Sequence, residues 1–183
     1  MKALMLLANG FEDTEGLTTR DVLIRGGMEV VTASITSQRE VISSFGIRLL
    51  ADTTIDQVSS DGFDLIILPG GGRGTMNLMQ SEAAHRLVLS FYKEEKVLCA
   101  ICAAPMVYGH LGLLKGKCFT CFAGCNKGVD GIFTASEVEV DGNFITARSM
   151  NYSIPFALAI LEKMLGKEVK EKVIMGLQGL IEK

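Results

Sequence analysis

The residue with the clearest chemical potential is Cys102, which stands where an apolar segment meets a run of small residues. Residues 97–101 are apolar, and Ala103-Ala104-Pro105 follow the cysteine. A cysteine between a strand and a helix meets the unpaired N–H groups and the positive end of the helix dipole, and both favour a thiolate. The position predicts either a nucleophile on a strand–turn–helix elbow, whose pKa the helix end lowers, or a buried and inert cysteine.

A glycine-rich run, Pro69-Gly70-Gly71-Gly72-Arg73-Gly74, follows residues 64–68, which are apolar except for Asp64. No Lys-Ser/Thr pair follows it, as a Walker A loop requires, and no glycine at position 75 or 77 completes a dinucleotide-binding fingerprint. Two interpretations remain. The run is either an anion or oxyanion hole made of backbone N–H groups, or a tight turn that binds nothing.

Three acidic side chains, Glu12, Asp13 and Glu15, gather in a short early segment. Most acids at such positions stabilise a helix N-terminus and stay solvated. One that points inward toward Cys102 would be pushed toward its protonated form by the charge of a thiolate. Such a carboxyl group would donate a hydrogen bond to the sulfur or transfer a proton to a substrate.

The spacing of four cysteines, Cys99, Cys102, Cys118 and Cys121, formally matches a zinc site. However, residues three apart on a strand project to opposite faces, which argues against zinc and against a thioredoxin-like pair at 99 and 102. The sequence therefore predicts no metal and no cofactor. Cys125 has no clear role.

The only two histidines, His85 and His110, fall in predicted helices. His85 is expected to be exposed on its helix. His110 lies about two turns after Cys102 on one helix, which is too far for a hydrogen bond. The local sequence therefore predicts no Cys–His dyad.

Apolar strands alternate with helices along the chain. Strands are expected over residues 2–8, 28–34, 64–68 and 97–101, helices over 12–26, 81–96, 103–111, 153–165 and 168–181, and hairpins at 40–50 and 137–147. This pattern predicts an α/β fold with a mostly parallel sheet covered on both faces. Because sites in such sheets lie at the carboxyl ends of strands, the loops after residues 8, 68 and 101 are expected to meet.

The composition limits the classes of function. A chain of 183 residues suits a single domain over 1–183. A net charge of −3, no Trp and 7% aromatic residues argue against a nucleic-acid partner. The uncharged stretch 97–114 is interrupted by Pro105 and Gly109, so it predicts a buried strand and helix and no membrane partner. Five cysteines without a visible export signal predict reduced thiols in the cytoplasm.

Three segments resemble the ThiJ/PfpI family, a branch of the class-I glutamine-amidotransferase-like superfamily. They are Phe11-Glu12-Asp13-Thr14-Glu15, Leu68-Pro69-Gly70-Gly71 and Ala100-Ile101-Cys102-Ala103-Ala104-Pro105. The resemblance runs from about residue 2 to the last helix, and is greatest to the subgroup of the human parkinsonism-associated protein deglycase. It implies a flavodoxin-like three-layer sandwich that is usually a homodimer.

The resemblance also implies roles for individual residues. Cys102 would be the nucleophilic, oxidation-prone cysteine, and Glu15 the protonated acid that hydrogen-bonds with it. The backbone N–H groups of Gly70, Gly71 and Ala103 would form the anion pocket.

Other positions match the family or depart from it. Arg25 matches an arginine near the pocket or the dimer interface. Cys121 takes the place of the family's variable histidine near the pocket, so a Cys–His–acid triad is not expected. Ser44-Phe45-Gly46 stands where the subgroup often has Ser-Arg-Gly, and an anion-binding arginine is lost. Arg148-Ser149-Met150-Asn151-Tyr152 replaces Arg-Gly-Pro-Gly-Thr, and the bulkier loop would reshape the pocket mouth.

Three functions are therefore considered. The first is a cysteine-dependent enzyme for small reactive carbonyls, which would convert methylglyoxal to lactate as a cofactor-free glyoxalase or remove its early protein adducts. The second is a redox sensor or chaperone in which Cys102 is oxidised without turnover. The third is an amidotransferase- or protease-like hydrolase, which the missing histidine weakens. The expected partners are a small carbonyl substrate or an oxidant, and a second copy of the chain.

Overall fold

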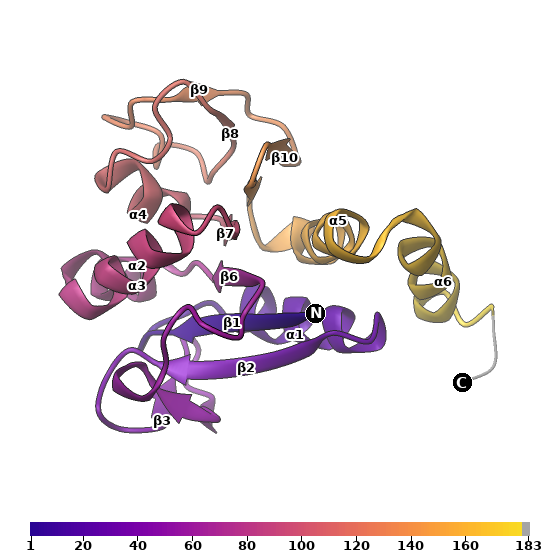
Figure 1. Cartoon of the computed structure of the whole chain (residues 1–183), viewed down its shortest axis with the longest axis horizontal. Helices are drawn as coiled ribbons and strands as arrows, with labels where there is room; N and C mark the ends of the chain where they lie inside the picture. The colour runs from indigo at the N-terminus through magenta and orange to yellow at the C-terminus, as the bar shows by residue number, and fades with distance from the viewer. Residues whose placement is uncertain (181–183) are drawn as a thin grey trace.

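A seven-stranded sheet forms the centre of the computed structural model, which describes residues 1–180 (Figure 1). Its strands are β1 (Lys2–Leu7), β2 (Glu29–Ser34), β5 (Thr53–Thr54), β6 (Leu65–Leu68), β7 (Val97–Ile101), β10 (Val138–Asp141) and β11 (Phe144–Ala147). The strand order is β10-β11-β7-β6-β1-β2-β5, and all neighbours are parallel except β10 and β11. The mostly parallel sheet of the sequence prediction is confirmed.

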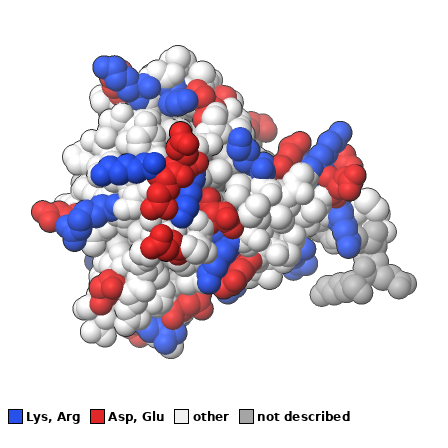
Figure 2. Space-filling view, viewed as in Figure 1, with Lys and Arg blue, Asp and Glu red and all other residues white. Residues whose placement is uncertain are grey.

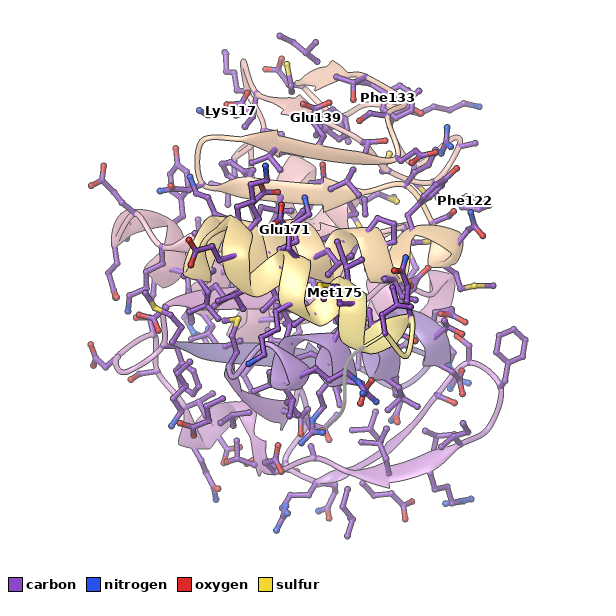
Figure 3. All side chains as sticks on the ribbon, turned by 90° about the vertical axis from the view of Figure 1, so that its right-hand side faces the viewer. Lys117, Phe122, Phe133, Glu139, Glu171 and Met175 are labelled. Carbon is purple, nitrogen blue, oxygen red and sulfur yellow. The ribbon has the colours of Figure 1, made fainter. Side chains whose placement is uncertain are left out.

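Helices cover both faces of this sheet. They are α1 (Asp13–Arg25), α2 (Gly72–Gln80), α3 (Glu82–Lys93), α4 (Pro105–His110), α5 (Ser153–Leu165) and α6 (Lys167–Leu177). Residues of α1, α5 and α6 share one buried cluster with the sheet, and residues of α2, α3 and α4 share the other. Figure 3 shows α6 as the outermost layer, with Glu171 and Met175 on its surface. The flavodoxin-like three-layer arrangement is therefore as predicted.

Both faces of the central strands are buried, which explains why they are continuously apolar. Along β1, Met5 and Leu7 belong to one cluster, and Leu4 and Leu6 belong to the other. A strand with polar residues on alternate positions would leave polar groups unpaired beneath the helices on one side.

Two small strand pairs lie outside the main sheet. β3 (Glu40–Ile42) and β4 (Arg48–Leu50) form the predicted antiparallel hairpin, and β8 (Cys118–Phe119) runs parallel to β9 (Ile132–Phe133). The turn at Asp141-Gly142 joins β10 to β11, as the sequence predicts.

The helix α2 is missing from the sequence prediction, which treats residues 69–74 only as a loop. Gly72 and Gly74 lie inside its first turns. A Cβ atom at Gly74 would stand 2.8 Å from the backbone of Phe11, so this glycine allows α2 to pack against the loop after β1. The prediction was wrong because glycine lowers helix propensity, while the tertiary packing favours the helix.

Other boundaries differ by a few residues. The helix expected from 103 begins at Pro105, and the last helix ends at Leu177, while position 181 of its predicted range lies outside the described residues. Within residues 1–180, no helix is long and apolar enough to cross a membrane. The uncharged stretch 97–114 divides into β7 and α4, as expected.

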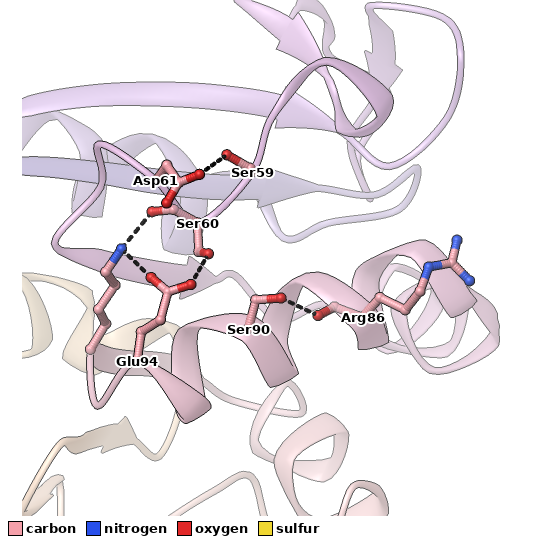
Figure 4. A network of polar contacts seen from close by, with 7 residues as sticks. Ser59, Ser60, Asp61, Arg86, Ser90 and Glu94 are labelled. Atoms are coloured by element: carbon pink, nitrogen blue, oxygen red, sulfur yellow. Dashed lines mark hydrogen bonds and ion pairs between the residues drawn. The ribbon is translucent and has the colours of Figure 1, made fainter.

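A polar network joins the loop before β6 to the end of α3 (Figure 4). Lys96 donates to the Ser60 carbonyl oxygen over 2.7 Å and pairs with Glu94 at 2.6 Å, and the Ser60 hydroxyl also donates to Glu94. This network lies at the amino ends of β6 and β7, at the opposite edge from Cys102. It secures the sheet edge and takes no part in the candidate site.

Acidic and basic side chains alternate over the face drawn in Figure 2. With a net charge of −3, this face carries no continuous basic surface of the kind that binds a phosphate backbone.

Candidate active site around Cys102

Three loops meet at the carboxyl ends of β1, β6 and β7, as the sequence predicts. β6 lies between the other two strands in parallel register, so their last residues stand side by side. The Glu12 N–H donates to the Gly70 carbonyl oxygen over 3.0 Å, which joins the first loop to the second. Gly70 also lies against the third loop, because a Cβ atom there would stand 2.8 Å from the Cβ of Cys102.

Cys102 adopts a strained backbone conformation at the end of β7. Its φ of 63° lies in the left-handed region, which is uncommon for a residue with a side chain. Its N–H donates to the Ala147 carbonyl oxygen, and its own carbonyl oxygen accepts from the Phe122 N–H, both over 2.8 Å. These bonds hold the strained conformation and present a half-buried thiol at a strand–turn–helix elbow.

The three acids of the first loop have separate roles. The Glu12 carboxylate accepts from the Glu15 N–H at 2.7 Å and caps α1. Asp13 accepts from the Ser43 hydroxyl at 2.6 Å and from the Phe45 N–H at 3.2 Å, which attaches the β3–β4 hairpin to the site. Only Glu15 turns inward, with 1% of its surface exposed.

The Glu15 carboxyl group faces the Cys102 thiol, because a Cβ atom at Gly70 would stand 2.6 Å from Oε2 of Glu15 and 2.8 Å from the Cβ of Cys102, and each group raises or lowers the pKa of the other. Its Oε2 atom also accepts from the Gly70 N–H over 2.9 Å. Its Oε1 atom is buried and has no hydrogen bond of regular geometry among the described residues. A carboxylate with one unpartnered buried oxygen is costly, whereas a protonated carboxyl group needs one acceptor fewer.

Burial raises the pKa of Glu15 to about 7, and the charge of Glu12 acts in the same direction. The hydrogen bonds from Cys102 and from the Gly70 N–H oppose this shift but do not cancel it. A carboxyl group with such a pKa exchanges its proton near neutral pH, which is the property that an acid–base group needs.

The pKa of the Cys102 thiol is raised, first by burial and then by the charge and hydrogen bond of an ionised Glu15. The N–H groups of Gly71 and Ala103 hydrogen-bond to the sulfur and lower this pKa. The prediction that the helix end lowers the thiol pKa is therefore wrong, because burial and the ionised Glu15 outweigh the two N–H groups. Two negative charges side by side are disfavoured, so the pair retains at least one proton at neutral pH.

The glycines of the second loop permit close packing. A Cβ atom at Gly70 would stand 2.6 Å from Oε2 of Glu15, and one at Gly71 would stand 2.5 Å from the Gly10 carbonyl oxygen. Gly71 also has a φ of 91°, a conformation that disfavours other residues. The Gly70 N–H donates to Glu15. The prediction that it is a free donor of the anion pocket is therefore wrong. The Gly71 and Ala103 N–H groups face the sulfur.

Arg25 and Cys121 differ in how close they lie to Glu15 and Cys102. Arg25 lies on the last turn of α1, about 15 Å along the helix from Glu15, and forms an exposed pair with Asp21 at 2.6 Å. A role of Arg25 in the pocket is therefore excluded by its position, and a role at a dimer interface stays a prediction. Cys121 precedes Phe122, whose N–H holds Cys102.

Cys121 cannot replace the missing histidine as a base. It is fully buried, and burial together with the neighbouring Cys125 raises its pKa to about 12. Figure 3 shows Phe122 on the side of the molecule away from Lys117, and the Phe122 N–H donates to the Cys102 carbonyl oxygen. The loop after β8 thus closes one side of the site without supplying an acid–base group.

The two histidines stack on each other, with ring centroids 5.4 Å apart. His85 is half-buried, and its Nε2 atom is buried without a partner, so the expectation of an exposed ring is wrong. The reason is that α4 brings His110 over it. Within residues 1–180, no group of three or more His, Cys, Asp or Glu side chains is arranged to hold a metal ion.

Two positioning features have no signal in the sequence. One is Asp13, which anchors the hairpin, and the other is the Arg148–Tyr152 pair beyond β11. The Arg148 guanidinium lies over the Tyr152 ring at 4.8 Å and donates to the Ala135 carbonyl oxygen over 3.0 Å. The Asp13 contacts join residues about 30 positions apart that only the folded chain brings together. Arg148 and Tyr152 are four residues apart, but no residue pattern distinguishes their contact from an ordinary solvated arginine.

Comparisons with known proteins agree with this geometry. The model of the DJ-1/PfpI family matches residues 1–163. The chain belongs to the DJ-1/PfpI family. Its relatives include the Arabidopsis thaliana protein DJ-1 homolog B, which is 40% identical over 167 residues, and the Drosophila melanogaster protein dj-1beta, which is 35% identical over 178 residues.

Coverage differs between these relatives. The alignment spans 90% of this chain but 38% of the Arabidopsis protein, and 96% of this chain with 95% of the Drosophila protein. The solved Drosophila structure has a TM-score of 0.91 at 34% identity, with 97% of each chain covered. The structure of Toxoplasma gondii DJ-1 in an oxidized form has the same TM-score at 30% identity, also with 97% of each chain covered. The DJ-1 fold thus extends over nearly the whole chain.

The raised pKa of Glu15 predicts how stability varies with pH. A carboxyl group whose pKa rises from 4.5 unfolded to about 7 folded loses stabilisation as pH rises through that interval. Relative to Glu15→Gln, wild type should lose about 3 kcal/mol of unfolding free energy between pH 4.5 and 7.5, measured by urea denaturation.

The matched control is Glu137→Gln, which neutralises an exposed carboxylate. The difference in unfolding free energy between Glu137→Gln and wild type should stay nearly constant between pH 4.5 and 7.5. A difference between Glu15→Gln and wild type that does not change with pH would show that folding does not raise the pKa of Glu15.

Proposed function

We propose that the chain is a cysteine-dependent, cofactor-free enzyme for small reactive carbonyls, of the glyoxalase or deglycase type. The observation that carries this proposal is the contact between a strained, half-buried Cys102 and a buried Glu15 whose pKa is raised to about 7. A nucleophile beside a group that exchanges protons at neutral pH is the arrangement that addition to an aldehyde requires.

The proton of the pair belongs on Glu15 in this proposal, so that Cys102 carries the negative charge. The sulfur receives two backbone N–H groups, from Gly71 and Ala103, whereas the carboxyl group receives one, from Gly70. A protonated Glu15 donates its O–H to the sulfur and removes one of the causes that raise the thiol pKa, whereas burial, the larger cause, remains. These contacts must overcome the ordinary difference in acidity between a carboxyl group and a thiol.

In the first step, the Cys102 sulfur attacks the aldehyde carbon of methylglyoxal and forms a C–S bond. Glu15 gives its proton to the carbonyl oxygen, which yields a neutral hemithioacetal. The N–H groups of Gly71 and Ala103, which face the sulfur, are the donors that would stabilise the charge developing on the carbonyl oxygen before Glu15 protonates it.

In the second step, the Glu15 carboxylate removes the hydrogen from the former aldehyde carbon. The proton is returned to the adjacent carbon through an enediolate, which converts the hemithioacetal into a thioester. Water then hydrolyses the thioester, releases lactate and restores Cys102. The balance is methylglyoxal plus water to lactate, with no oxidant, metal or organic cofactor consumed.

A redox sensor or chaperone is the second candidate. It is favoured by the exposure of the Cys102 thiol together with two N–H groups that would stabilise an oxidised, anionic sulfur. The Toxoplasma relative was solved in an oxidized form. An amidotransferase- or protease-like reaction has less support, because Cys121 supplies no base where a triad would need one.

The apolar surface beside the site supports a homodimer. Leu17 on α1 is 44% exposed, and Phe45 and Leu50 in the β3–β4 hairpin are 82% and 70% exposed. Leu17 and Leu50 also line a cavity of about 170 Å³ between α1 and the hairpin. We expect a second copy of the chain to cover this surface, because exposed apolar side chains concentrated on one face mark an interface.

The dimer is tested by sedimentation equilibrium. Wild type should sediment with twice the mass of the chain, and Leu50→Asp should shift toward the monomer. The control Met175→Asp changes an equally apolar, 43% exposed residue on α6 and should remain a dimer. A monomeric wild type, or a dimer unaffected by Leu50→Asp, would contradict this interface.

We assign this chemistry to a reducing compartment, the cytoplasm. All five cysteines are free thiols, and the proposed reaction requires a reduced Cys102.

The enzymatic proposal is tested by lactate formation from methylglyoxal. Cys102→Ser should abolish turnover, and Glu15→Gln should lower kcat at least 100-fold, because proton transfer by a positioned group contributes about 10²–10⁴. Cys118→Ser, which alters a half-buried thiol on β8, should retain wild-type turnover. Absence of turnover in wild type, with peroxide oxidising Cys102 before the other cysteines, would reject the enzyme and favour the redox sensor.

A further inference from the structure

Arg148 lies directly beside the candidate nucleophile. Cys102 donates its N–H to the carbonyl oxygen of Ala147, the residue before Arg148. This bond places the Arg148 Cα about 5 Å from the Cys102 nitrogen. Ala147 belongs to the cluster under α1 and α5, so Thr146, the residue before it on β11, faces the opposite side of the sheet. Arg148 follows the end of β11, and its side chain contacts Ala135 and Tyr152.

The loop after β8 lies on that same face. Thr146 Oγ1 accepts from the Thr120 N–H over 2.9 Å, and two residues later the Phe122 N–H bonds to Cys102. Arg148 and the segment 120–122 therefore stand on either side of the elbow. A cation at this position is within reach of a molecule bound to the Cys102 sulfur.

The guanidinium group of Arg148 is held in place but not neutralised. It donates to the Ala135 carbonyl oxygen and to the Tyr152 hydroxyl, and it stacks over the Tyr152 ring. Ala135 itself has a φ of 54°, a costly conformation that directs its carbonyl oxygen to this arginine. Among residues 1–180, no carboxylate forms an ion pair with Arg148.

We infer that Arg148 is a binding subsite for a carboxylate, and that the site takes small 2-oxo or 2-hydroxy acids as ligands. A guanidinium has five donors, and two are used here, which leaves a pair for the two oxygens of one carboxylate. A single planar fork fits a carboxylate, whereas a phosphate carries more charge than one arginine offsets. Tyr152 acts as a positioning residue, because it holds the plane of the guanidinium.

This inference rests on the proposed function, since lactate, the product of that reaction, belongs to the ligand class. It deepens the proposal by naming what holds the end of the molecule that does not react. Arginine at this place favours acidic ligands over neutral ones of the same shape.

The test is a titration of the ¹⁵N-labelled full-length protein with sodium lactate at constant ionic strength, followed through the Arg148 Nε–H signal. Wild type should show a saturable shift. Lactamide, which has the same shape without the charge, should bind at least 10-fold more weakly. Binding requires no turnover, so loss of enzymatic activity alone leaves this result intact.

Variants separate recognition from a structural role. Arg148→Gln should raise the Kd for lactate at least 10-fold, and Tyr152→Phe, which keeps the ring but not the hydroxyl, should raise it about 2- to 5-fold. Arg86→Gln removes a 71% exposed arginine on α3 and should bind lactate like wild type. Thermal unfolding of each variant checks that the fold is retained.

Two results would overturn the inference. The first is lactate binding of equal strength in wild type and Arg148→Gln. The second is equal binding of lactate and lactamide by wild type, which remains decisive even where Arg148→Gln does not fold.

Discussion

The close approach of Glu15 and Cys102 is the interaction on which the rest of the site depends. It places a carboxyl group and a thiol together under burial, where two negative charges are disfavoured. One proton is therefore shared by two groups of different ordinary acidity. The sulfur is a nucleophile when this proton lies on Glu15. The surrounding backbone N–H groups determine which of the two groups holds the proton.

The fold supplies this contact through backbone geometry more than through side chains. Glu15 comes from α1, the glycine loop from the end of β6, and Cys102 from the end of β7, and the parallel register brings all three to one edge. Gly70 must lack a side chain because the two reactive groups leave no space for one. The left-handed backbone at Cys102 is held by hydrogen bonds from neighbouring segments, so the strain is distributed over the sheet edge.

The periodicity of apolar residues and the positions of Gly and Pro predict the main sheet and most helices, because apolar strands between glycine-rich loops are local signals. The elbow at Cys102 and the acid at Glu15 are predictable in kind, since position relative to strand ends determines them. The helix α2 is not predictable from local signals, because the packing of Gly74 on Phe11 outweighs the low helix propensity of its glycines. The thiol pKa is not predictable either, because it depends on burial and on Glu15, which comes from a distant segment. The same holds for the bond from Arg148 to the Ala135 carbonyl oxygen, which joins residues on either side of the β10–β11 hairpin.

The most direct test of this account is the pH dependence of Cys102 alkylation by iodoacetamide, read by peptide mass spectrometry in wild type and in Glu15→Gln. If Glu15 holds the proton, Cys102 reacts as a thiolate below pH 7, ahead of Cys118, and Glu15→Gln moves its midpoint to higher pH because an O–H donor is lost. If instead Cys102 reacts only at alkaline pH and Glu15→Gln lowers its midpoint, then Glu15 is ionised first. The thiolate mechanism would then be wrong for this protein.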